Sequence, residues 1–196
     1  MRSAEIKRKT SETDIALTLN LDGTGKGSIQ TGVGFMDHML TLFARHGRFD
    51  LDVICRGDTM VDDHHSVEDI GIVLGAAIAQ AVGDKRGIRR YGSMLLPMDE
   101  ALVLCALDLS GRSCLRYQAQ IPAQKIGTFD TELVEEFFLG LTRSAGLTLH
   151  MKQLDGTNSH HIVEAMFKAL GRALGEAVSH DARLGDEIPS TKGVLV

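Results

Sequence analysis

The stretch Asp62-Asp63-His64-His65-Ser66-Val67-Glu68-Asp69 has a second, closely related copy in this chain. That copy reads Asn158-Ser159-His160-His161-Ile162-Val163-Glu164, and its histidines lie 96 positions after the first pair. Both copies keep the pattern His-His-x-x-Glu, and both run directly into a long, alanine-rich apolar segment. An ordinary polar helix start explains one such motif, but two copies at matched positions predict an internal duplication.

The residue types of the motif favour metal binding, since imidazoles and carboxylates suit a borderline divalent transition metal. Helical residues three positions apart lie on nearly one face, so we expect the second histidine of each pair, His65 or His161, to meet its own glutamate. Adjacent helical residues point about 100° apart, so the first histidine is expected to face elsewhere, which predicts two metal ions. Asp62 or Asp63, and Asp69, are candidate carboxylates for holding the imidazole tautomers.

The duplication extends to the pattern of secondary structure on both sides of the motif. Alternating and helical apolar periodicities predict the same order of elements in each half. The first half is predicted to have strands over 15–21, around 29 and over 49–55, a helix over 35–45 and a motif helix that ends near 83. The second half is predicted to have strands over 101–109, 114–120 and 147–151, a helix over 131–144 and a motif helix that ends near 178.

This order predicts an α+β fold in a single domain, 1–196, because no Pro/Ser-rich linker separates the halves. The two strand-strand-helix-strand-helix half-units cover about 1–93 and 94–196, and each is expected to form a small mixed sheet with helices on one face. The helix over 70–82 is apolar nearly all round and needs cover on several sides. We therefore expect a homo-oligomer.

Composition places the chain among soluble globular proteins, with 43% apolar and 24% charged residues. The net charge of −5 gives no reason to expect nucleic-acid binding. The first residues lack the apolar core of a signal peptide, and no run approaches the roughly 18 apolar residues of a membrane span. Three cysteines without metal-site spacing indicate reduced side chains in a cytoplasmic protein.

Two residues outside the doubled motif are further candidate ligands. His38 lies among apolar residues of a predicted helix, where a lone histidine is usually a satisfied core residue. Its counterpart in the second half falls near Glu135 and Glu136, and Glu136 is the candidate substitute ligand at that place. The candidate metal ligands are His38, His64, His65, Glu68, Glu136, His160, His161 and Glu164.

Basic and hydroxyl residues in glycine-flanked loops are candidates for an anion site. They are Arg89, Arg90, Arg112 and, in the stretch Ser190-Thr191-Lys192-Gly193, the serine and the lysine. Arginine favours bidentate phosphate contacts, and small residues beside glycine allow close backbone approach. The alternative is a set of solvated loop charges, because sequence alone does not bring these loops together.

Several motifs beyond the doubled one occur in a characteristic order. They are Glu12-Thr13, Leu21-Asp-Gly-Thr-Gly, Phe35-Met-Asp-His-Met-Leu, Leu107-Asp-Leu-Ser-Gly-Arg, Gly127-Thr-Phe-Asp-Thr and Ile188-Pro-Ser-Thr-Lys-Gly-Val-Leu. Over nearly its whole length the chain resembles the imidazoleglycerol-phosphate dehydratases of histidine biosynthesis. The resemblance implies dehydration of D-erythro-imidazole glycerol phosphate to imidazole acetol phosphate with two manganese ions per active site. It also implies a 24-subunit shell with metal sites at subunit contacts.

The resemblance further implies how the candidate residues divide. One metal falls to His38, His65, Glu68 and His160, and the other to His64, the residue at 136, His161 and Glu164. The family motif usually has histidine at position 136, and this chain has Glu136; a carboxylate suits Mn²⁺ at least as well, so we expect a site with altered affinity. The implied catalytic residues are Glu12, His38, Glu68 and Glu164, and the implied substrate-binding residues are Glu12, His64, His65, Glu68, Arg90, Arg112, His160, Lys168, Ser190, Thr191 and Lys192.

The substrate's chemistry predicts a mechanism. The carbon that loses the proton has no adjacent carbonyl, so direct abstraction is very difficult. Metals on both ring nitrogens would stabilise an imidazolate. The imidazolate expels the neighbouring hydroxyl and becomes a diazafulvene. A carboxylate, for which Glu12 is the candidate, then removes the acidic proton and gives an enol that becomes the ketone. Two rival interpretations are a two-metal phosphoester hydrolase and a metal-buffering shell protein without catalysis.

Overall fold

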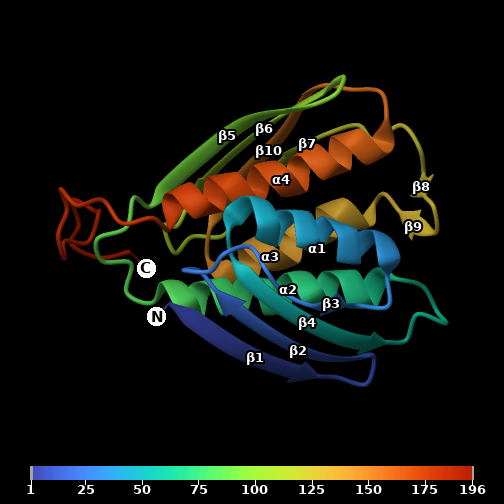
Figure 1. Ribbon diagram of the computed structural model, residues 1–196, viewed down its shortest axis with the longest axis horizontal. Helices are drawn as coiled ribbons and strands as arrows, with labels where there is room; N and C mark the ends of the chain where they lie inside the picture. Colours follow the sequence, from blue (N-terminus) through green and yellow to red (C-terminus); the bar gives the residue numbers. More distant parts are fainter. Residues whose placement is uncertain (1, 196) are drawn as a thin grey trace.

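The computed structural model describes residues 2–195 and contains two four-stranded sheets with four helices between them (Figure 1). The first half comprises β1 (Ser3–Lys9), β2 (Thr13–Asn20), β3 (Ile29–Gln30), α1 (Gly34–Gly47), β4 (Asp50–Gly57) and α2 (His64–Val82). The second half comprises β5 (Tyr91–Met98), β6 (Ala101–Asp108), β7 (Cys114–Gln118), β8 (Lys125–Ile126), β9 (Phe129–Asp130), α3 (Leu133–Ala145), β10 (Thr148–Asp155) and α4 (Ser159–Ala177).

The two sheets have the same topology, which confirms the duplicated mixed α+β fold. Their strand orders are β1-β2-β4-β3 and β5-β6-β10-β7. In each sheet the first three strands pair antiparallel, and the last one runs parallel to its neighbour. The helices cover one face of each sheet, as expected, and α2 and α4 pack directly on the strands.

Each half begins with an edge strand that the sequence analysis did not predict. β1 pairs with β2 along its whole length, and β5 pairs with β6 in the same way, across the approximate boundary at 93–94. In β1 the exposed positions are charged or polar, whereas β5 also exposes the apolar Tyr91 and Leu95, so neither strand alternates clearly. In β1 only Ala4 is buried, with Ile6 half-buried. The half-unit is therefore strand-strand-strand-helix-strand-helix.

Close helix contacts at glycine hold each pair of helices together. A Cβ atom on Gly75 of α2 would lie 2.4 Å from the carbonyl oxygen of Leu141 in α3. One on Gly171 of α4 would lie 2.5 Å from the carbonyl oxygen of Phe43 in α1. These contacts are equivalent, since Gly171 lies 96 positions after Gly75 and Leu141 lies 98 positions after Phe43. The two halves are thus joined by two equivalent helix crossings, α2 with α3 and α4 with α1.

Replacing Gly171 with alanine is expected to lower the free energy of unfolding by about 1–3 kcal/mol, because the new methyl group overpacks against the backbone of α1. Gly34, the first residue of α1, offers a matched control, since a Cβ atom there meets nothing within 4 Å. Gly34→Ala is expected to change stability by about 0.5 kcal/mol or less. Urea unfolding of both variants measures this, and equal midpoints would contradict the proposed packing.

Helix α2 lies in the core. By length and composition it is the one helix within residues 2–195 that is apolar enough to cross a membrane, yet 67% of that segment is buried inside the protein. It packs against α3, β1 and β2, which supply the cover that its apolar surface requires. This burial is typical of a core helix.

Candidate active site

Three of the predicted ligands meet where α1 and α4 run side by side. His38 lies on α1, and His160 and Glu164 lie on the first turns of α4. Their ligand atoms lie within 4.8 Å of one another, with Glu164 Oε2 3.3 Å from His38 Nε2 and 3.0 Å from His160 Nε2. The interpretation of His38 as an ordinary core histidine is wrong, because its side chain is 46% exposed.

Glu164 is the buried member of this cluster, with 7% of its surface exposed. Burial by itself raises the pKa of this carboxyl, but hydrogen bonds from Lys168, His38 and His160 outweigh it and lower the pKa to about 2. Lys168 Nζ lies 2.5 Å from Glu164 Oε1. The cluster is therefore a negative ligand beside two imidazoles, a donor set that divalent transition metals accept.

The corresponding region lies between α2 of the first half and α3 of the second half. His64 Nε2 lies 3.9 Å from Glu68 Oε2, as His160 lies beside Glu164. Glu136 lies 98 positions after His38, the offset at which α3 and α1 correspond in their glycine contacts. The helix packing therefore makes Glu136 the structural counterpart of His38, as the sequence analysis inferred. It lines a cavity of about 590 Å³ together with Asp130, Thr131, Glu132 and Glu135.

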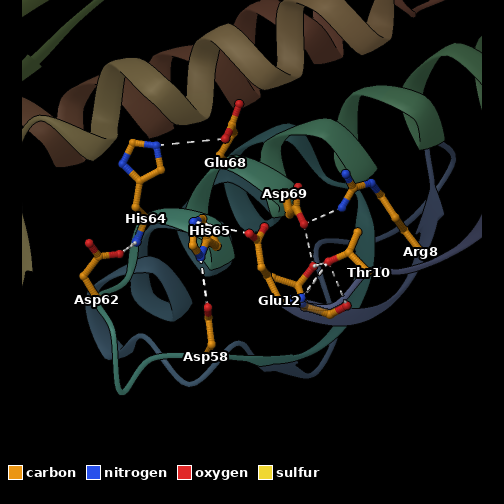
Figure 2. Close-up of polar contacts among 10 residues, drawn as sticks. Arg8, Thr10, Glu12, Asp58, Asp62, His64, His65, Glu68 and Asp69 are labelled. Atoms are coloured by element: carbon orange, nitrogen blue, oxygen red, sulfur yellow. Dashed lines mark hydrogen bonds and ion pairs between the residues drawn. The ribbon is translucent and has the colours of Figure 1, made fainter.

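The sequence analysis expected the second histidine of each pair to contact the glutamate, and this expectation was wrong. The first histidine of each pair, four positions before the glutamate, contacts it, and the second one turns away. The physical reason is competition from carboxylates outside the helix. His65 Nδ1 lies 3.0 Å from Asp58 Oδ2 (Figure 2), and His161 Nδ1 lies 2.7 Å from Glu100 Oε2. The rings of each pair are nearly perpendicular, which confirms their splay.

Two of the three aspartates predicted to orient the imidazoles, Asp62 and Asp69, have other partners. Asp62 accepts the backbone N–H of His64 at 2.8 Å. Asp69 is buried and accepts hydrogen bonds from Arg8 and Thr13, which ties β1 and β2 to α2 (Figure 2). For Asp63, burial and the neighbouring Asp130 raise the pKa of the carboxyl. Asp58 and Glu100 occupy the place that these aspartates were predicted to fill.

Glu12 lies at the turn between β1 and β2, next to the first motif (Figure 2). Its carboxylate Oε1 is 3.8 Å from His65 Nε2, and its side chain is 50% exposed. The hydroxyl of Thr10 accepts the backbone N–H groups of Glu12 and Thr13, which fixes the turn. The structure therefore places the candidate base beside the metal-ligand candidates and open to solvent.

The predicted anion residues, except Arg89, meet in one pocket of about 540 Å³. Arg89 instead lies 3.4 Å from Glu176 of α4. The segment after α4 folds back and brings its hydroxyl and lysine residues to the loops before β5 and after β6 (Figure 1). Arg112 and Lys192 are exposed, whereas Arg90 is half-buried and its side chain is held by hydrogen bonds. Its guanidinium donates to Asp108 at 2.7 and 3.0 Å and to the carbonyl of Pro189 at 2.9 Å. The lining includes Arg90, Tyr91, Arg112, Ser190, Thr191 and Lys192.

The ligand clusters and the anion pocket lie at opposite ends of the chain's long axis (Figure 1). His38, His64 and His160 belong to the N-terminal ends of α1, α2 and α4, and the pocket lies near the C-terminal ends of α2 and α4. Lys168 stays with Glu164 on α4 and is not among the residues that line the anion pocket. The ligand clusters and the anion pocket are therefore not brought together within this chain.

Sequence reasoning missed Asp58 and Glu100 as functional candidates. Asp58 directly follows Gly57 at the end of β4, and Glu100 lies in the turn between β5 and β6. Neither shares a motif with the histidine that it contacts. Only the folding of β4 and the β5–β6 hairpin beside the helix starts reveals them.

Comparison with known sequences identifies relatives along the whole chain. A family model described as imidazoleglycerol-phosphate dehydratase matches residues 31–174. An imidazoleglycerol-phosphate dehydratase from Lachnoclostridium phytofermentans is 62% identical over 194 residues, covering 99% of this chain and 98% of that protein. One from Jannaschia sp. is 60% identical over 195 residues and covers both chains completely.

Solved structures of the same enzyme share the fold. The imidazoleglycerol-phosphate dehydratase of Staphylococcus aureus superposes with a TM-score of 0.84 at 42% identity, covering 91% of this chain and 99% of that one. The one from Pyrococcus furiosus has a TM-score of 0.85 at 39% identity, covering 97% and 100%. The duplicated half-units are therefore shared with experimentally determined structures.

Proposed function

The chain belongs to the imidazoleglycerol-phosphate dehydratase family, and from this we propose that it dehydrates D-erythro-imidazole glycerol phosphate to imidazole acetol phosphate with two Mn²⁺ ions per active site. It is a hydro-lyase of histidine biosynthesis. The observation that carries the metal part of the proposal is the convergence of His38, His160 and Glu164. Its free cysteines support a reducing, cytoplasmic location.

The donor set fits manganese. Mn²⁺ accepts imidazole nitrogen and carboxylate oxygen and favours about six ligands. The cluster at α1 and α4 offers three donors, and on α2 His64 lies beside Glu68, with Glu136 of α3 as a further candidate donor. This grouping differs from the division that the resemblance implies, because Glu164, assigned there to the second metal, lies in this chain beside His38 and His160. His65 and His161 would add the remaining imidazoles. When bound, the metals would supply Lewis acidity at the nitrogens of the substrate's ring.

The chain's own residues would divide the remaining work between the two ends of the substrate. Arg112, Lys192 and the hydroxyl of Ser190 would bind the phosphate, since exposed cationic donors and a hydroxyl suit its oxygens. Arg90 would hold the segment that carries Ser190, because it donates to the carbonyl of Pro189. Glu12 would accept the proton from carbon, and the hydroxyl of the neighbouring carbon would leave with a proton as water. This elimination gives the enol, which then tautomerises to the ketone.

A complete site requires more than one subunit in this proposal. The ligand clusters and the anion pocket lie at opposite ends of one protomer (Figure 1), and each cluster supplies only half of a manganese coordination shell. We therefore propose a homo-oligomer, with 24 subunits as the expected number, whose metal sites form at subunit contacts. Neither nucleic acid nor a membrane is a proposed partner.

The direct test is to incubate the manganese-loaded protein with imidazole glycerol phosphate and to measure the ketone and free phosphate. We expect ketone without phosphate release. Arg112→Ala and Lys192→Ala are each expected to lose roughly 10- to 150-fold in kcat/KM, because a charge-assisted hydrogen bond contributes about 1.5–3 kcal/mol. Their manganese content should stay at the wild-type value.

The other outcomes separate the rival functions. Phosphate release would support a two-metal hydrolase instead. Full metal occupancy with no product of either kind would support metal buffering and would exclude the proposed lyase. Asp84→Ala, which removes only a surface partner of Arg86, is the control variant and should keep full activity.

A further inference from the structure

We propose that Asp58 and Glu100 are positioning residues, which hold Nδ1 of His65 and His161 so that Nε2 of each ring is presented to a metal ion. The proposal deepens the proposed function and rests on its metal site. It assigns a task to two carboxylates that do not belong to the doubled motif and do not belong to the ligand clusters.

The first contact is built into the loop that follows β4 (Figure 2). Asp58 Oδ2 and Oδ1 lie 3.0 and 3.2 Å from His65 Nδ1. The backbone of Asp58 is fixed on both sides, since its N–H donates to the carbonyl of Glu12 at 3.0 Å and its carbonyl accepts the N–H of Val61 at 2.8 Å. The carboxylate therefore extends toward the ring from a backbone that two hydrogen bonds hold in place.

The second contact is built differently but meets the same ring nitrogen. Glu100 lies in the β5–β6 hairpin, with Oε2 2.7 Å from His161 Nδ1. Its other oxygen accepts the backbone N–H groups of Asn158 at 2.7 Å and Thr157 at 3.2 Å, just before α4. Both carboxylate oxygens of Glu100 are therefore held in place, one by the start of α4 and the other by the ring of His161.

The two carboxylates do not correspond through the internal duplication. The residue 96 positions after Asp58 is Leu154, and the hairpin that corresponds to the one with Glu100 carries Glu12 instead. Glu12 and Glu100 are matching glutamates, directly before β2 and β6, but only Glu100 lies at hydrogen-bond distance from a histidine Nδ1. Two unrelated positions supply one contact, to Nδ1 of the second histidine, so the contact itself is the feature that both halves share.

This contact decides which nitrogen is free. A carboxylate at hydrogen-bond distance needs a donor, so Nδ1 carries the proton and a neutral ring leaves its lone pair on Nε2. The nearest carboxylates to the Nε2 atoms are Glu12 at 3.8 Å from His65 and Asp99 at 3.6 Å from His161, beyond hydrogen-bond distance. A carboxylate behind a ligating imidazole also raises its basicity, and losing it typically weakens metal binding about 10- to 100-fold.

The test compares Asp58→Ala and Glu100→Ala with the wild-type protein by competition for Mn²⁺ against a chelator of known affinity. We expect each variant to bind manganese about 10- to 100-fold more weakly. The Mn²⁺ electron paramagnetic resonance spectrum should also change, because a ring that is free to rotate alters the ligand field. At saturating manganese, kcat should recover to within a few-fold of wild type, as a positioning role predicts. The conservative variants Asp58→Asn and Glu100→Gln should bind manganese with affinities between those of the wild type and the alanine variants.

Two controls separate the possible failures. Thermal unfolding of the metal-free variants should stay near that of wild type, and Asp84→Ala should bind manganese as wild type does. Unchanged affinity and spectrum in both alanine variants would overturn the positioning role while leaving the wild-type activity, and hence the proposed function, intact. Weaker binding that follows only from a large loss of folded protein would also overturn it. If the wild-type protein binds no manganese, the proposed function itself fails.

Discussion

Glu164→Gln is expected to abolish dehydration and to lower manganese content together. The carboxylate is buried and receives hydrogen bonds from His38, His160 and Lys168, which lower its pKa to about 2. Glutamine keeps the shape but has no charge to bind a cation. Loss of a metal that stabilises several kcal/mol of transition-state charge corresponds to roughly a thousandfold or greater fall in kcat/KM.

A companion variant makes this result interpretable. Glu164→Gln also leaves Lys168 without its anionic partner, and its side chain is only 16% exposed, so folding must be measured. His160→Ala damages the same cluster through a ring that is 42% exposed and is expected to fold normally. Glu5→Gln, on the exposed edge strand, is the control for a lost carboxylate. Full activity in both cluster variants would contradict the assignment of these ligands.

Two inactive variants are expected to restore each other when they assemble together. His160→Ala damages the ligand end of the protomer, and Arg112→Ala damages the anion pocket at the opposite end (Figure 1). If an active site takes the cluster that contains His160 from one subunit and its phosphate pocket from another, random mixed oligomers contain intact sites. For equal co-expression we expect about a quarter of the wild-type activity, because each of the two contributions is intact in half of the subunits.

The matched control is co-expression of Arg112→Ala with Lys192→Ala. Both changes lie in the same pocket, so every mixed site that receives either pocket is damaged and no activity should return. Absence of restoration in properly assembled mixtures of His160→Ala and Arg112→Ala would refute the composite site.

Chelation is expected to lower the apparent mass of the wild-type oligomer if metals join subunits.

Much of the candidate site was predictable because its residue types recur at fixed spacing. The doubled His-His-x-x-Glu motif and the flanking periodicities were enough for the duplicated α+β fold, and the matched position of Glu136 relative to His38 followed from them. The edge strands β1 and β5 were missed, since an edge strand needs little apolar alternation. Their existence depends on pairing with β2 and β6 rather than on their own pattern.

The partners of the histidines depended on tertiary contacts. The sequence places both histidines of a pair within reach of the glutamate, because helical residues three and four positions apart share a face. Which one turns toward it was decided by Asp58 and Glu100, which arrive from β4 and from the β5–β6 hairpin and hold His65 and His161.

The sequence by itself determined the duplication, the helices and strands of each core half-unit, and the set of residues able to bind a metal and an anion. Periodicity and residue chemistry are local properties, and they are present in the chain before it folds. The tertiary structure alone decided which atoms meet: that His38 joins His160 and Glu164, that the phosphate candidates share one pocket, and that the two sites lie at opposite ends. Those juxtapositions depend on how the helices cross and where the chain returns.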